Sequence, residues 1–194
     1  MITTEQVKEL RDKTGVSIMQ CKKALEDAGG DIEKALVLLK KKGAEIADKK
    51  GDRTLGAGVV QAYIHTSGTI GAMVELLCET DFVAKNEEFK ALAYDIAMQV
   101  AATKPEFLQM SDITDEAKEK AREVFMKEVE GKPEEMKAQI LEGKMNAYFK
   151  DMVLLQQTFI KDDSLTVEGK ISNAIQKFGE KVVVGKFARF AIVG

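Results

Sequence analysis

Residues 73–83 read Met-Val-Glu-Leu-Leu-Cys-Glu-Thr-Asp-Phe-Val, an apolar run that ends in an acid and an aromatic. The run predicts a β-strand up to about Cys78, and Thr80 is a typical N-cap residue for a helix that follows. Asp81 then lies where the positive end of a helix dipole favours a carboxylate. The stretch therefore predicts a strand that passes directly into a helix, with Phe82 at the junction.

Phe82 can point either into the core or towards a partner. In an unbroken helix from Thr80, Phe82 would precede Phe89 by seven residues and would share its buried stripe. Phe side chains are also among those most often buried. Spacing alone therefore favours a core position for Phe82.

A small antiparallel sheet is predicted around this stretch. Residues 59–65 and 69–78 have the composition of strands, and residues 66–68, Thr-Ser-Gly, form a short turn between them. Residues 181–193 are expected to form a closing strand beside this hairpin, which gives three strands. Strands, then helices, then one strand indicate an α+β core.

Helical patterns fill the chain between the hairpin and the closing strand. A long helix is expected from the region 80–86 to about Thr103. Residues 112–161 predict two or three amphipathic helices, which fit a charged helical hairpin that projects from the body. Thr166 is expected to cap a last helix, which Gly179 ends.

Residues 1–45 predict a small domain of three short helices. Capping boxes are expected at Thr3 with Gln6 and at Ser17 with Gln20. Three glycines are expected to end the helices: Gly15, Gly29 and Gly43. Residues 46–55 are rich in charge and indicate a linker. The α+β core would then occupy residues 56–194, with the helical insertion at about 112–161.

The composition is that of an ordinary globular protein. The 194 residues carry a formal net charge of −3, which argues against a mainly nucleic-acid function. Two cysteines, Cys21 and Cys78, lie within apolar patterns, as in a reduced intracellular protein. No apolar run approaches the roughly 18 residues that span a bilayer. We therefore expect a soluble cytoplasmic protein without direct nucleic-acid or membrane contacts.

Candidate catalytic groups are few. His65 is the single histidine, and a nucleophilic pair with Cys78 across the hairpin is conceivable, but no third group is identified to orient it. The glycines do not form a phosphate-binding loop. Asp162-Asp163 and Glu134-Glu135 are adjacent pairs, which a helix turns apart, so solvated surface is favoured over a metal site. We expect no enzymatic activity, no metal and no cofactor.

Residues 79–83, Glu-Thr-Asp-Phe-Val, resemble the signature of bacterial translation elongation factor Ts, and residues 75–78 and 84–86 fit it on either side. The resemblance covers nearly the whole chain. It is also carried by residues 10–11, 14–15, 21–25, 30–31 and 34–35 near the N-terminus, and by 142–144 and 157–162 further on. The N-terminal segments resemble the family's ubiquitin-associated-type three-helix domain.

The resemblance implies a guanine-nucleotide exchange factor for elongation factor Tu, in both its GDP-bound and nucleotide-free forms, during protein synthesis. In the family, the Asp and Phe of the signature contact the GTPase, and the Phe wedges between helices so that magnesium and phosphates lose ligands. The matching residues are Asp81 and Phe82, framed by Thr80 and Val83. The N-terminal domain of the family also touches the GTPase, and the matching residues are Arg11, Ile18 and Met19.

This chain departs from the family pattern at a few positions. Ile18 stands where Met is common, and Leu77 stands where Asn is usual. The chain is also shorter than many members, so a homodimer, or a two-to-two complex with elongation factor Tu, becomes plausible beside a one-to-one complex. The three-helix pattern alone also permits a helical adaptor that binds ubiquitin-like or other partners without affecting nucleotide exchange. A hydrolase built on Cys78 and His65 is a third hypothesis.

Overall fold

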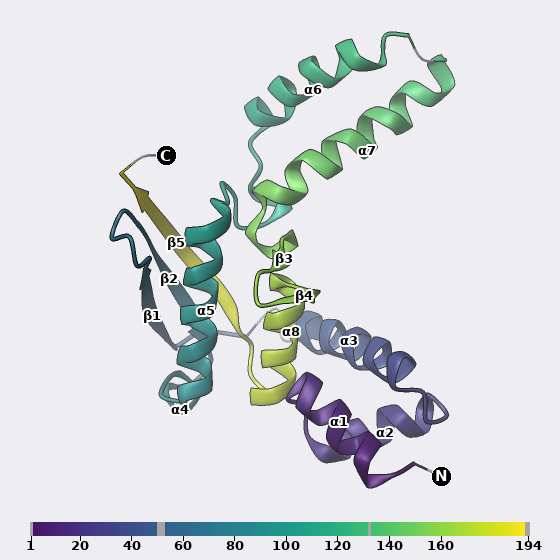
Figure 1. Ribbon diagram of the computed structural model, residues 1–194, viewed down its shortest axis with the longest axis vertical. Helices are drawn as coiled ribbons and strands as arrows, with labels where there is room; N and C mark the ends of the chain where they lie inside the picture. Colours follow the sequence, from purple (N-terminus) through teal and green to yellow (C-terminus); the bar gives the residue numbers. More distant parts are fainter. Residues whose placement is uncertain (1, 50–52, 132, 193–194) are drawn as a thin grey trace.

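The computed structural model describes residues 2–49, 53–131 and 133–192 (Figure 1). Three helices open the chain, namely α1 (Thr4–Thr14), α2 (Ile18–Asp27) and α3 (Ile32–Lys49). We call these helices the N-terminal bundle. They share a small apolar cluster that includes Leu10, Cys21, Leu25, Ala35 and Leu39. The three expected helices are confirmed, and they have a core of their own.

Local capping sets the limits of α1 as expected. The Thr3 hydroxyl accepts a hydrogen bond from the Gln6 N–H at 3.2 Å, and the Gln6 side chain accepts one from the Thr3 N–H at 2.9 Å. This is a reciprocal capping box. Gly15 ends the helix with a φ of 68°, in the left-handed region that favours glycine.

Gly43 does not end a helix, so that prediction is wrong. It lies inside α3, and a Cβ at this position would collide with the Gln176 side chain of α8 (Val167–Phe178). Gln176 Nε2 donates a hydrogen bond to the Leu39 carbonyl of α3 at 2.5 Å. Close packing between α3 and α8 therefore requires the glycine. The helix also covers residues 46–49 of the expected linker, while residues 50–52 lie outside the described residues.

The centre of the molecule is a three-stranded antiparallel sheet in the order β1-β2-β5. Its strands are β1 (Ala57–Ile64), β2 (Ile70–Cys78) and β5 (Val183–Ala191). Ala57 pairs with Cys78 and Ile64 with Gly71, so the predicted hairpin and its third strand are confirmed. Helix α5 (Glu87–Thr103) packs on one face of the sheet (Figure 1) and covers alternate residues of β2: Ala72, Val74, Leu76 and Cys78.

The helix expected after β2 is divided in two. Helix α4 (Asp81–Ala84) is a single turn, and α5 starts after Asn86. The Asn86 side chain accepts a hydrogen bond from the Glu88 N–H at 2.8 Å. Asn is a preferred N-cap residue, so α5 begins anew instead of continuing α4.

A helical hairpin projects from the body, as expected (Figure 1). It consists of α6 (Asp115–Val129) and α7 (Glu134–Met152), and the short helix η1 (Met110–Asp112) precedes it. An apolar cluster that includes Ile113, Ala121, Phe149 and Val153 holds the two helices together. The Phe107 ring meets Phe149 edge-on, which connects the base of the hairpin to the body.

The helical pattern does not continue to residue 161. After η2 (Leu154–Gln156), strands β3 (Thr158–Phe159) and β4 (Asp162–Thr166) form a second small sheet. Buried Gln99 of α5 explains this departure. Its Nε2 donates to the Thr158 carbonyl at 3.1 Å, and its Oε1 accepts from the Ile160 N–H at 2.8 Å. This side chain satisfies backbone groups that a helix would have paired internally.

Helix α8 begins and ends where the sequence predicts. The Thr166 hydroxyl accepts a hydrogen bond from the Gly169 N–H at 3.1 Å, and Gly179 ends the helix at a φ of 70°. α8 packs against α3, and Lys40 of α3 donates to the Ser164 carbonyl at 3.2 Å. The N-terminal bundle therefore lies directly against the core in this structure.

Candidate partner-binding site

The junction between β2 and α4 displays three predicted site residues, Thr80, Asp81 and Phe82, which we call the tip. Thr80 has an extended backbone and caps α4, because its hydroxyl accepts a hydrogen bond from the Val83 N–H at 3.5 Å. The next two side chains, of Asp81 and Phe82, are exposed. The strand end thus presents an acid and an aromatic side by side.

Phe82 is exposed over 81% of its surface, while Phe89 is fully buried. The core position that spacing favours for Phe82 is therefore wrong. The reason is the break after Ala84: the seven-residue spacing only aligns two side chains when one continuous helix joins them. An exposed Phe in a stable turn is unusual for a residue type that is mostly buried.

Val83 and Ala84, the other half of α4, face the core. Val83 is 3% exposed and belongs to the main apolar cluster beneath the sheet. Its side chain is therefore not on the surface with Asp81 and Phe82, although the sequence resemblance groups it with them. Val83 fixes the turn from inside, which leaves Phe82 facing outward.

Asp81 is paired with a basic residue of the next turn. Its Oδ2 lies 2.6 Å from Lys85 Nζ, and both side chains are exposed. The hydrogen bond from Lys85 and its charge lower the pKa of the Asp81 carboxyl below its ordinary value. Asp81 is therefore ionised at neutral pH and can accept hydrogen bonds from a partner.

Glu180, which no sequence pattern identifies, holds the base of the tip. Its Oε2 accepts hydrogen bonds from the Glu79 N–H at 3.1 Å and from the Thr80 N–H at 3.0 Å. Its Oε1 accepts the Thr80 hydroxyl at 2.5 Å. A residue about a hundred positions away in sequence has no local signal that links it to the tip.

Glu79, which directly follows β2, connects the tip to two further segments. The Glu79 carboxylate accepts hydrogen bonds from Arg53 Nη1 at 2.9 and 3.2 Å and from the Lys181 N–H at 2.5 Å. The strand end is thus joined to the segment before β1 and to the segment before β5. These bonds tie the residue before the tip to both of these segments.

The predicted N-terminal site residues lie on a different element. Arg11 is in the last turn of α1, and Ile18 and Met19 begin α2. All three side chains are exposed, with Met19 at 83%. Figure 1 places α1, α2 and α4 at the same end of the molecule. Arg11, Ile18 and Met19 are thus exposed on α1 and α2 of the bundle, whereas the tip lies on the core.

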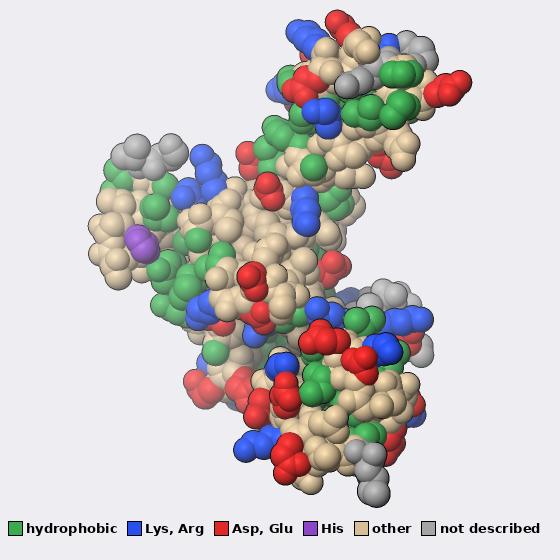
Figure 2. Space-filling view, turned by 45° about the vertical axis from the view of Figure 1, so that its right-hand side comes forward, with side chains coloured by type: hydrophobic (Ala, Val, Ile, Leu, Met, Phe, Trp, Pro, Cys, Tyr) green, Lys and Arg blue, Asp and Glu red, His purple; other side chains and the backbone are tan. Residues whose placement is uncertain are grey.

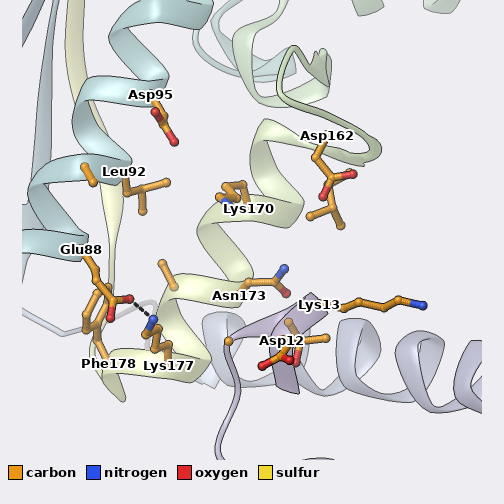
Figure 3. A pocket seen from close by; sticks show the side chains of 15 residues that line it. Asp12, Lys13, Glu88, Leu92, Asp95, Asp162, Lys170, Asn173, Lys177 and Phe178 are labelled. Carbon is orange, nitrogen blue, oxygen red and sulfur yellow. Dashed lines mark hydrogen bonds and ion pairs between the residues drawn. The ribbon is translucent and has the colours of Figure 1, made fainter. Parts of the chain in front are cut away.

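A cleft of about 340 Å³ is lined by residues of both the bundle and the core (Figure 3). It lies between α1, α5 and α8, and its walls carry both signs of charge, among them Asp12, Asp95, Lys170 and Lys177. Lys177 of α8 forms an ion pair with Glu88 of α5 across it. Sequence patterns gave no indication of this cleft.

The structure contradicts the hydrolase hypothesis. Cys78 pairs with Ala57 at one end of the hairpin, whereas His65 follows Ile64 at the other end. Seven residues of strand, roughly 23 Å, lie between these ends. Cys78 is buried, and its thiol donates to the Thr80 carbonyl at 3.2 Å. Burial, together with the Glu180 charge, raises the pKa of the Cys78 thiol, which disfavours the nucleophilic thiolate.

Residues 2–49, 53–131 and 133–192 contain no cluster of three His, Cys, Asp or Glu side chains that could hold a metal ion. Among them there is also no helix with the length and apolar character needed to cross a bilayer.

An exposed acid and an exposed aromatic on a turn that is anchored from inside are features typical of a surface that binds another macromolecule. Comparison with known proteins agrees with this interpretation. Residues 5–193 match the family model described as elongation factor TS. The chain belongs to the elongation factor Ts family, and membership implies a nucleotide exchange factor for elongation factor Tu in translation elongation.

Curated relatives support the assignment over almost their full length. Elongation factor Ts of Carboxydothermus hydrogenoformans is 47% identical over 194 residues, covering 99% of this chain and 89% of the relative. Elongation factor Ts of Thermotoga petrophila is 46% identical, covering 98% and 96%. Elongation factor Ts of Desulforamulus reducens is 48% identical, covering 97% and 88%.

Proposed function

We propose that this protein promotes GDP release from elongation factor Tu by inserting Phe82 near the switch helices of the GTPase. The insertion would disturb the ligands of the bound magnesium and phosphates. The observation that carries the proposal is the 81% exposure of Phe82 on a turn whose next two residues are buried. Asp81 would accept hydrogen bonds from the GTPase beside it.

A wedge of this kind needs no chemistry of its own. GTPases hold magnesium between protein side chains and phosphates, so a small shift of a switch element weakens several ligands together. The exchange factor must only bind the loosened state more tightly than the nucleotide-closed state. By linkage, nucleotide then weakens the binding of the exchange factor by the same factor.

Phe82 is not sufficient on its own. Burying one Phe side chain contributes about 1.5–3 kcal/mol. An acceleration of GDP release by about 10⁴ requires roughly 5.5 kcal/mol of differential stabilisation. A second contact must supply the remainder. We assign it to Arg11, Ile18 and Met19, which are exposed on the N-terminal bundle at the same end of the molecule.

We also propose that the two contacts belong to two different domains of the chain. Residues 1–45 would form a ubiquitin-associated-type domain, residues 46–55 a charged linker, and residues 56–194 the exchange core with its insertion at about 112–161. The separate apolar cluster of the bundle supports the first boundary. The continuation of α3 to Lys49 would make the beginning of the linker helical.

We further propose that two copies associate through the outer face of the sheet, in a homodimer or a two-to-two complex with elongation factor Tu. The face away from α5 exposes a group of large apolar side chains: Val60, Ile64, Met73, Phe190 and Ile192. Gly71 of β2 pairs with Ile64 on one side and Phe190 on the other, so the patch is continuous across the strands. Hydrophobic side chains also gather around His65, which follows β1, on the side of the molecule that Figure 2 shows. Monomers rarely expose large contiguous apolar patches.

The family and its translational partner support a cytoplasmic location, and we propose no direct contact with nucleic acid or membrane. The function is tested by mixing the protein with elongation factor Tu loaded with fluorescent GDP and excess unlabelled GDP. We expect the rate of fluorescence loss to rise with the concentration of the protein. Stable binding without any change in the GDP release rate would contradict exchange activity and would favour the adaptor.

A further inference from the structure

We propose that Glu180 is a positioning residue for the tip: its carboxylate fixes the backbone from which Phe82 projects and thereby sets the exchange rate. The proposal rests on the proposed function, because it concerns the same tip. Glu180 would not itself touch elongation factor Tu. It would act through Thr80 and α4.

The first argument is the number of bonds that converge on one side chain. Glu180 accepts three hydrogen bonds from two consecutive residues, at 3.1, 3.0 and 2.5 Å. Two of the donors are backbone N–H groups, so the carboxylate fixes the course of the main chain. Thr80, which donates twice, in turn accepts the Val83 N–H and starts α4. The path from Glu180 to the turn that carries Phe82 is therefore continuous.

The second argument is that α4 is too short to be stable without tertiary contacts. It has four residues, and the first turn of any helix is unfavourable because several backbone angles are fixed for a single hydrogen bond. Tertiary contacts must stabilise the turn. Burial of Val83 and Ala84 provides one, on the inner side. Glu180 provides the other, at the start of the turn, where the direction of Phe82 is decided.

The third argument is that Glu180 is itself well fixed. It follows Gly179, which ends α8, and α8 lies between α5 and α1 (Figure 3). Gln176, one turn earlier and 6% exposed, donates to the Leu39 carbonyl of α3. The residue that holds the tip is therefore close to the contact that holds the N-terminal bundle. The two proposed contacts with elongation factor Tu share one support.

The hydrogen-bond geometry separates two possible roles of Glu180: holding the backbone of the tip, and supplying a negative charge. Both backbone N–H groups meet the same carboxylate oxygen, and the other oxygen meets a hydroxyl. A Gln side chain can keep its oxygen on the two N–H groups and donate its amide to the hydroxyl, which can also accept. Glu180→Gln should therefore preserve the tip, whereas Glu180→Ala should release it.

The test is a double-mutant cycle with Glu180→Ala and Phe82→Ala, measured by GDP release from elongation factor Tu. With Phe82 present, we expect Glu180→Ala to lower the maximal exchange rate about tenfold, with the half-saturating concentration changed less than about twofold. In the Phe82→Ala variant, adding Glu180→Ala should lower the maximal exchange rate by less than about twofold, because Glu180 acts through Phe82. Glu180→Gln should stay within about threefold of the wild type.

Glu168→Ala is the matched control. Glu168 is an exposed acid at the start of α8, and its carboxylate accepts a hydrogen bond from the side-chain amide of Gln156 instead of from the backbone of the tip. This variant should exchange like the wild type. Three results would each overturn the proposal. The fold-losses in exchange rate of the two single variants could simply multiply in the double variant. Glu180→Gln could lose as much activity as Glu180→Ala, or Glu180→Ala could exchange at the wild-type rate. If Glu180→Ala does not fold, Glu180→Asp takes its place in the cycle with the same expectations, because its side chain is one methylene group shorter and cannot hold the same three hydrogen bonds. Absence of exchange by the wild type would instead refute the proposed function.

Discussion

Phe82 and Val83 are adjacent in sequence and lie in opposite environments, with exposures of 81% and 3%. A single helical turn produces the difference, because successive side chains on a helix point about 100° apart. Val83 packs into the main apolar cluster and fixes the turn. Phe82 is consequently held outward, where a partner can bury it.

This contrast predicts different stabilities for two neighbouring truncations. Val83→Ala leaves a cavity in the core and should lower the free energy of unfolding by about 1–3 kcal/mol. Phe82→Ala removes an exposed side chain and should change it by less than about 0.5 kcal/mol. Chemical denaturation of both variants measures the two values. A large loss of stability in Phe82→Ala would mean that the ring is buried in solution.

Gly43 offers a test of the contact between the bundle and the core. Gly→Ala inside a helix normally stabilises it by roughly 0.5–1 kcal/mol. At Gly43 the new methyl group would meet the Gln176 side chain, so we expect Gly43→Ala to be destabilising instead. Gly143 of α7 is the control, because a Cβ there has open space and Gly143→Ala should be stabilising. Equal effects at the two glycines would contradict the close approach of α3 and α8.

The N-terminal contact predicts a change in binding without a change in stability. Met19 and Ile18 are exposed, so Met19→Ala and Ile18→Ala should leave the denaturation midpoint unchanged. We expect each to raise the half-saturating concentration for exchange by about two- to tenfold, as for peripheral apolar contacts. Val124→Ala, an equally apolar and exposed truncation on α6, is the control. Wild-type values for both bundle variants would remove this surface from the proposed interface.

The Asp81–Lys85 pair predicts a titration shift. The folded pKa of Asp81 is below its ordinary value of 3.8, because Lys85 donates to the carboxylate. Any stabilisation by this pair is therefore present above the ordinary pKa and is lost as the pH falls through the lower, folded value. NMR titration of the Asp81 carboxyl should show the low pKa, and Lys85→Ala should raise it. An unchanged titration in Lys85→Ala would contradict the pair.

The apolar sheet face predicts a change in oligomeric state. If two copies associate through this face, Phe190→Glu would place a charge in the interface and should convert the dimer to a monomer. Val37→Glu, at an exposed apolar position of α3 in the N-terminal bundle and away from this face, should leave the dimer intact. Light scattering of the purified chains distinguishes the two states. A monomeric wild type would contradict the proposed association.

Features set by local chemistry could be predicted from the sequence. Thr3, Thr80 and Thr166 cap helices where expected, and the hairpin turn at residues 66–68 joins the expected strands. In these cases one or two neighbouring side chains satisfy the backbone. The exposure of Phe82 followed from the family resemblance and not from its spacing, because a break at Asn86 removes the alignment with Phe89.

Features set by contacts distant in sequence could not be predicted. Gly43 has the local signature of a helix end, yet Gln176, more than a hundred residues away, makes it a packing position. Glu180 has no motif of its own, and its role depends on where β2 and α8 meet. Gln99 similarly imposes strand β3 on a segment with helical composition.

The central claim is that Phe82 drives nucleotide release, and the GDP release rate of Phe82→Ala tests it most directly. At saturating concentrations of both proteins, we expect a loss of at least about tenfold relative to the wild type, in line with the burial of one Phe. Met126→Ala, an exposed truncation on the projecting hairpin, should match the wild type. Equal release rates for Phe82→Ala and the wild type would contradict the account.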